Sequence, residues 1–153
     1  MDEQQERTPE SARFSSRVKA EARGSESAAT RAAIDAARAI REAAAELGPE
    51  EAGARVNIGL HWGATLMVGQ VATSGRLEVT ALGDQMNECA RIEAVARSGA
   101  VLASKDLIER LDLDDAAASG VDPDAVSYTP LGELAGAGEK AVRDAGTIPV
   151  AEI

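Results

Sequence analysis

The sequence has few aromatic residues and few residues that bind metals or form disulfides. Phe14, Trp62 and Tyr128 are its only aromatic side chains, so a surface that stacks bases or sugars on rings is disfavoured. The single cysteine, Cys89, excludes an internal disulfide. Together with the single histidine, His61, it also excludes a multi-cysteine or His-rich metal centre. This cysteine usage fits a reducing compartment.

The sequence also lacks long apolar runs and a surplus of basic residues. No apolar run approaches the roughly 18 residues of a membrane span, and the N-terminus is acidic where a signal peptide is basic. We therefore expect a soluble, cytoplasmic chain with no membrane partner. The formal net charge is −10. Because phosphate-backbone binding needs a basic face, this charge disfavours nucleic acid as a partner.

The 153 residues correspond to one domain. Its core should be modest, because 32 alanines account for much of the hydrophobic content of 44%. Residues 1–24 hold only Phe14 and Val18 as sizeable apolar groups, too few to offset the entropy of ordering them. We expect a disordered or loosely ordered arm over 1–24 and the folded domain over 25–153.

Hydrophobic periodicity predicts helices and short strands after residue 24. The pattern predicts a helix over 25–47 closed by Gly48, strands over 55–62, 65–71 and 77–82 with a turn over 73–75 between the last two, and a helix over 85–97 with Asp84 as N-cap. It then predicts a strand over 100–103, a helix that Ser104 caps and that runs to Leu111, a solvated acidic loop over 112–124, and closing strands over 126–131 and 147–153. The acidic loop lacks EF-hand spacing, which disfavours a calcium site. This order predicts an α+β fold with helices on one face of a largely antiparallel sheet.

The second predicted helix separates polar from apolar side chains. At about 100° per residue, Cys89, Ile92 and Ala96 fall on one side of the helix, and Asn87 and Arg91 fall together on nearly the opposite side. An amide beside a guanidinium, near the positive end of a helix, is suited to hold a polyphosphate and to stabilise charge in a transition state. The same pattern also fits a polar face that contacts only solvent, so both interpretations stay open.

Three motifs follow one another in strand, turn and helix context. Residues 55–63 read RVNIGLHWG, residues 83–91 read GDQMNECAR, and residues 99–104 read GAVLAS. With Gly69, they resemble the second half of the class III adenylate/guanylate cyclase catalytic domain, with its Gly-x-His-x-Gly strand and Gly-Asp-x-Val-Asn-x-Ala-x-Arg signature. The Ala-rich helix over 25–47 is similar to the helix before that strand. The resemblance implies a ferredoxin-like class III cyclase fold for nearly the whole chain after residue 24.

The resemblance also implies roles for three residues. Asn87 would orient the ribose, and Arg91 would contact the triphosphate as the 3′ oxygen attacks the α-phosphorus. Thr80 would lie where the family selects the purine, a position at which Asp or Thr often accompanies adenine. ATP, or GTP, is the implied substrate, and Mg²⁺ or Mn²⁺ the implied cofactor. Thr80 equally fits a plain polar strand face, and His61 and Trp62 are interpreted as structural.

Two departures from the family separate this chain from a complete cyclase. The family's first half, with the two aspartates that hold its metal pair, has no counterpart here, so we assign no metal ligand and expect the ligands to come from a partner chain. Ala135 stands where a phosphate-binding lysine is common, and Lys140 replaces that lysine only if its loop turns inward.

The sequence therefore predicts a partial cyclase domain that is inactive alone. It would act as a homodimer, or as a heterodimer with a complete cyclase. The alternative is a non-catalytic dimerisation or regulatory module derived from a cyclase, or a truncated reading frame.

Overall fold

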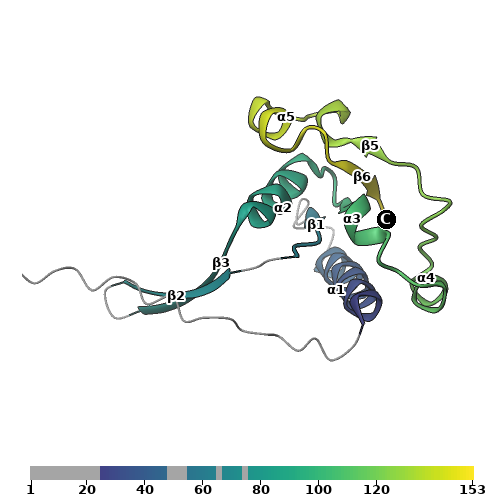
Figure 1. Cartoon of the computed structure of the whole chain (residues 1–153), viewed down its shortest axis with the longest axis horizontal. Coiled ribbons are helices and arrows are strands. Elements are labelled where there is room, and N and C mark those ends of the chain that lie inside the picture. The colour runs from purple at the N-terminus through teal and green to yellow at the C-terminus, as the bar shows by residue number, and fades with distance from the viewer. Residues whose placement is uncertain (1–24, 48–54, 65–66, 74–75) are drawn as a thin grey trace, which may run out of the picture.

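The computed structural model describes residues 25–47, 55–64, 67–73 and 76–153 (Figure 1). Along the chain these form α1 (Glu26–Glu46), β1 (Ile58–Leu60), β2 (Met67–Thr73), β3 (Arg76–Leu82), α2 (Asp84–Val95), β4 (Val101–Ser104), α3 (Lys105–Ile108), α4 (Leu113–Ser119), β5 (Thr129–Pro130), the 3-10 helix η1 (Leu131–Glu133), α5 (Glu139–Ala145) and β6 (Pro149–Glu152). The predicted arm over 1–24 and the predicted cap Gly48 lie outside the described residues. The chain is a small α+β domain, as predicted.

The described strands form one mixed sheet and one separate hairpin. The sheet has the order β1-β4-β6-β5, in which β1 pairs with β4 in parallel and the other two pairings are antiparallel. The hairpin joins β2 to β3, from the pair Met67 and Leu82 to the pair Thr73 and Arg76, and it projects away from the sheet (Figure 1). The prediction of one largely antiparallel sheet was therefore only partly right, because β1 pairs in parallel and the hairpin stands apart.

Helices cover both faces of the four-stranded sheet, whereas the sequence predicted helices on one face only. Neighbouring residues of a strand point to opposite faces, and Leu102 and Ala103 in β4 accordingly enter two different clusters. One cluster joins α2 and α5 to the sheet through Ile92, and the other joins α1, α3 and α4 through Ile34 and Ile108. All four residues of β4 are buried, which explains why its sequence lacks a polar face.

β1 is shorter than predicted, and its polar face lies against α2. A Cβ atom added to Gly59 would lie 2.5 Å from the backbone nitrogen of Glu93 in α2, so only glycine permits this close approach. The Cys89 thiol of α2 donates to the Gly59 carbonyl oxygen at 3.4 Å. Leu60 on the strand packs on the cluster that contains Ile34 of α1. β1 is therefore enclosed between α2 and α1.

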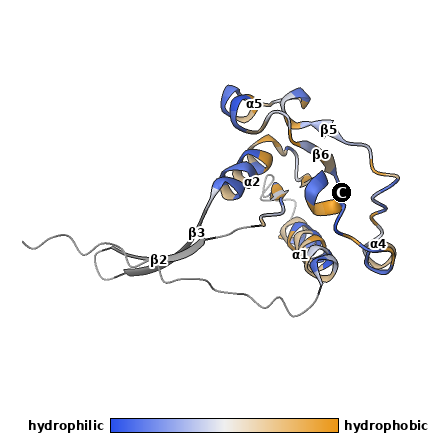
Figure 2. Ribbon diagram, viewed as in Figure 1, coloured by the Kyte–Doolittle hydropathy of each residue, from blue (hydrophilic) through white to orange (hydrophobic). Residues whose placement is uncertain are grey.

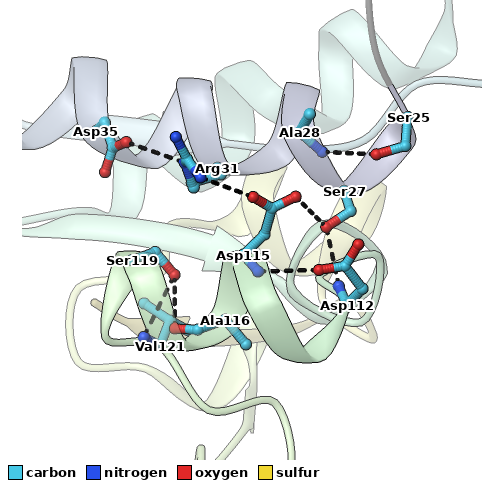
Figure 3. A network of polar contacts seen from close by, with 10 residues as sticks. All are labelled: Ser25, Ser27, Ala28, Arg31, Asp35, Asp112, Asp115, Ala116, Ser119 and Val121. Carbon is cyan, nitrogen blue, oxygen red and sulfur yellow. Dashed lines mark hydrogen bonds and ion pairs between the residues drawn. The ribbon is translucent and has the colours of Figure 1, made fainter.

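The acidic segment over 112–124 is not the solvated loop that we predicted. It contains α4, in which the Asp112 carboxylate accepts from the backbone nitrogen of Asp115 and so caps the helix. The Ser27 hydroxyl of α1 donates to Asp115 at 2.6 Å and accepts from the backbone nitrogen of Asp112 at 2.9 Å (Figure 3). Arg31 bonds the same Asp115 carboxylate at 2.9 Å. The acidic residues thus attach α4 to α1.

Several predicted boundaries also need correction. Gly83, with φ of 148°, is the N-cap of α2, so Asp84 is the first helical residue and its side chain makes no capping bond. Ser104 does cap α3, as predicted, by accepting from the backbone nitrogen of Leu107. α2 ends at Val95 rather than at residue 97, α3 ends at Ile108, both closing strands are shorter than predicted, and α5 was not predicted.

Among the described helices, none combines the length and the apolar character that a bilayer span requires.

Candidate functional site

Asn87 and Arg91 line one hollow at the N-terminal half of α2. The hollow has a volume of about 440 Å³ and is lined by Asp84, Asn87, Glu88 and Arg91 of α2 and by Asp144 of α5. This volume falls within the range of about 300–1,000 Å³ that is usual for small-molecule sites. The helical geometry predicted from the sequence therefore brings the amide and the guanidinium to the same place.

α2 presents these polar groups because its other side is held in the core. Ile92 is fully buried and Val95 is 3% exposed, whereas Asn87 is exposed and Arg91 is half-buried. The helix changes from hydrophilic at the end that follows β3 to hydrophobic toward its far end (Figure 2). The polar hollow thus borders the N-terminal turns, where unpaired backbone N–H groups favour an anion.

Arg91 is bonded to a carboxylate of another helix. Its Nε donates to Oδ2 of Asp144 at 3.2 Å, across the contact between α2 and α5. Asp144 also accepts from Nε of Arg143 at 2.6 Å and from Nη2 of Arg143 at 3.2 Å. The hydrogen bond from Arg143 holds the pKa of Asp144 below its usual value, and Arg91 lowers it further. Asp144 is therefore an ionised acceptor shared by two guanidinium groups.

Glu88, another residue that lines the hollow, is paired with His61. Nε2 of His61 lies 2.9 Å from Oε2 of Glu88, and the imidazole is only 4% exposed. Nδ1 of the same ring is buried without a hydrogen-bond partner among the described residues. The neighbouring thiol of Cys89 faces β1, and burial raises its pKa, with Glu93 adding to the effect. His61 thus connects β1 to α2 and orients a carboxylate of the hollow.

The hollow is acidic as it stands. Three carboxylates, those of Asp84, Glu88 and Asp144, line it against the single guanidinium of Arg91. A triphosphate therefore meets repulsion unless cations accompany it or a carboxylate moves aside. In the part of the chain that the structure describes, no group of three or more His, Cys, Asp or Glu side chains is placed to hold a metal ion. The residues present do not fit the metal pair that the cyclase resemblance implies.

Of the other predicted residues, Lys140 and Ala135 do not line the hollow. The backbone of Thr80 lies in β3 opposite Gly69, and its side chain is outside the part of the structure that is described. Lys140 is exposed on α5 and is not one of the residues that line the hollow. Ala135, at the position where the family favours lysine, is exposed in the turn before α5.

Sequence reasoning missed Asp144, because it missed α5. Gly138 and Gly146 flank this helix as its N-cap and C-cap, and this pair of glycines was the available signal. A periodicity test had little power over a helix of 7 residues.

A larger hollow of about 930 Å³ lies elsewhere, at α4. Its wall combines carboxylates, including Asp122 and Asp124, with apolar groups such as Leu111 and Ala116. Among the described residues that line it there is no lysine, arginine, histidine, serine or cysteine. Its described lining offers no cationic partner for an anion, whereas Arg91 lines the hollow at α2, so we place the candidate site at α2 despite the smaller volume.

Comparisons with known proteins return no match, since no family model, no curated protein and no solved structure is similar to this chain at a significant level. A functional assignment must therefore stand on the residues and their geometry.

Proposed function

We propose that the chain is a nucleotidyl cyclase homology domain that supplies one half of an active site for cyclic nucleotide synthesis from ATP or GTP. The observation that carries the proposal is that Asn87 and Arg91, the polar residues of the Gly-Asp-x-x-Asn-x-x-x-Arg motif, line one hollow beside the N-terminal turns of α2. The spacing of the motif puts both residues on one face of α2, and the hollow lies at that face. The fold proposed with this function is the ferredoxin-like class III cyclase fold, with its metal-binding half contributed by another chain.

Arg91 and Asn87 have different roles in binding and positioning the nucleotide. The guanidinium of Arg91 carries a permanent charge and a planar set of donors, which match phosphate oxygens and stabilise the charge that grows as pyrophosphate leaves. The amide of Asn87 both donates and accepts, so it can hold a ribose hydroxyl and aim the 3′ oxygen at the α-phosphorus. Thr80, in the strand before α2, is the proposed contact to the base, with adenine favoured over guanine.

The proposal requires a second chain. The carboxylates that would hold Mg²⁺ or Mn²⁺ would belong to the partner, and the metal would supply neutralisation of phosphate charge there. A complete cyclase is the partner that this requirement favours, whereas a homodimer of the chain, which lacks these ligands, fits the non-catalytic alternative. The cysteine-poor composition of the chain supports a cytoplasmic location for it.

A second candidate function is a non-catalytic dimerisation or regulatory module. Its specific support is the bond between Arg91 and Asp144, which occupies the guanidinium without any ligand. In that case α2 and α5 keep a structural contact and no turnover depends on it.

Complementation with a defective partner separates the two candidates. The partner is a complete class III cyclase whose own Asn and Arg of this motif have been replaced, so that it keeps only its metal-binding half-site. We expect cyclic AMP formation when the wild-type chain is added, and loss of at least tenfold of this rate with Arg91→Ala or Asn87→Ala. Arg55→Ala is the matched control, because Arg55 is exposed and lies beside Gly99, beyond the opposite end of α2. Equal rates from wild type and Arg91→Ala would refute the half-site.

The chain alone provides a complementary test. With Mn²⁺ and ATP, the purified chain should form no cyclic AMP above background, because its described residues do not assemble a metal cluster. Product that scales with the concentration of the chain and disappears in Arg91→Ala would show that the second half is dispensable.

A further inference from the structure

The carboxylate of Asp144 lies between two guanidinium groups at the rim of the hollow. It accepts one bond from Arg91 of α2 and two bonds from Arg143 of α5, at distances of 2.6 to 3.2 Å. Converging guanidinium groups are the arrangement by which proteins hold a carboxylate or a phosphate. The oxygens of Asp144 therefore mark a position that suits any oxyanion, and the protein fills it with its own side chain.

Packing of α5 against α2 fixes the position of Asp144 relative to Arg91. Ala141 and Ala145 of α5 are 5% and 3% exposed and belong to the cluster that also contains Ile92 and Val95 of α2. Asp144 directly precedes Ala145, so packing of α5 against α2 sets the position of its backbone. Only the side chain, which is 32% exposed, has freedom to turn.

We infer that Asp144 is a built-in competitor, which we call the Asp144 latch: its carboxylate occupies the place of a ligand oxyanion, and a polyphosphate binds only when this carboxylate turns away and releases Arg91 and Arg143. The inference rests on the proposed function for the identity of the natural ligand, a nucleoside triphosphate. The exchange of one anion for another at the guanidinium groups follows from the contacts alone.

The latch explains why the hollow is acidic around an anion-binding group. With Asp144 turned away, the guanidinium of Arg91 faces two lining carboxylates, those of Asp84 and Glu88, instead of three. The lowered pKa of Asp144 keeps its carboxylate ionised well below neutral pH. A competing anion, and not a proton, is therefore what opens the latch under ordinary conditions.

Inorganic tripolyphosphate is the probe that tests the latch without nucleotide chemistry. Its affinity is measured by titration calorimetry at low ionic strength, where charge effects are least screened, for wild type, Asp144→Asn, Arg91→Gln and the double variant. We expect Asp144→Asn to bind about five- to tenfold more tightly than wild type, the effect of removing one unit charge near a solvated site. In the Arg91→Gln background, Asp144→Asn should raise the affinity for tripolyphosphate by less than twofold. Asp114→Asn, an exposed carboxylate on α4, is the control for net charge and should match wild type.

Two results would overturn the latch. One is an unchanged affinity in Asp144→Asn, including no binding by any variant. The other is an equal gain with and without Arg91, which would reduce the effect to overall charge.

The complementation assay distinguishes this failure from failure of the proposed function. Tighter tripolyphosphate binding by Asp144→Asn, with no cyclic AMP from any variant, would keep the latch and refute the nucleotide half-site. Complementation by wild type, with unchanged tripolyphosphate affinity in Asp144→Asn, would refute the latch and keep the half-site.

Discussion

Ile92→Ala should be one of the most destabilising single substitutions in α2. Ile92 of α2 is fully buried against α5 and the sheet, in one cluster with Val95, Leu131 and Val150. Removal of its side-chain carbons beyond Cβ forfeits about 2.4 kcal/mol, at about 0.8 kcal/mol for each group withdrawn from water. The cavity that remains adds roughly 1 to 2 kcal/mol where the surroundings do not collapse. We expect a loss of about 3.5 to 4.5 kcal/mol in the free energy of unfolding.

Urea denaturation followed by far-UV circular dichroism measures this loss. Single domains have about 5 to 15 kcal/mol of stability, so this loss is a large fraction of the total. The urea concentration at the midpoint should fall sharply, and the dependence of the unfolding free energy on urea concentration should stay constant. Met86→Ala is the control, since Met86 lies on the same helix and is 36% exposed; its cost should stay below about 1 kcal/mol. A loss below about 1 kcal/mol for Ile92→Ala would refute the packing of α2 on the sheet.

Three further predictions concern other parts of the chain. Ser27→Ala should destabilise the fold by about 1 to 3 kcal/mol in the same urea assay, because it leaves Asp115 and the backbone nitrogen of Asp112 without their buried partner; a change below 0.5 kcal/mol, roughly the scatter of surface substitutions, would contradict the link between α1 and α4. Cys89 should react with a disulfide reagent more slowly than an unfolded thiol at pH 8, since its raised pKa lowers the thiolate fraction, and a rate equal to that of the urea-unfolded chain would contradict this. Sedimentation should detect a dimer or larger assembly at tens of micromolar, because β1 (Ile58–Leu60) is an edge strand among the described strands; a folded monomer would count against it.

Local patterns predicted the elements well where one residue type carries a clear signal. Ser25 was expected at the start of the first helix and is the N-cap of α1, and Ser104 caps α3 as expected. The segment over 73–75 was predicted to turn the chain between two strands, and β2 and β3 pair on either side of it. These features depend on residues that are close together in the sequence, so they can be predicted from a single sequence.

Contacts between distant segments could not be predicted in this way. The carboxylates of Asp112 and Asp115 appeared to belong to a solvated loop, because nothing nearby in sequence reveals that Ser27 and Arg31 of α1 lie against them. Asp144 is likewise 53 residues from Arg91. At the candidate site, helical geometry predicted that Asn87 and Arg91 share a face, and only the fold shows that a carboxylate of α5 joins them.

Binding of ATP at α2 can be observed directly by NMR. In ¹⁵N-labelled chain titrated with millimolar ATP, the account predicts NMR shift changes at the backbone amides of Asp84, Asn87, Glu88 and Arg91 and at the Arg91 side chain. These shift changes should be absent in Arg91→Ala. In Asp144→Asn they should reach the same size at a lower ATP concentration than in the wild type. No shift at these groups in either the wild type or Asp144→Asn, or shifts confined to other elements, would contradict a nucleotide half-site on this helix.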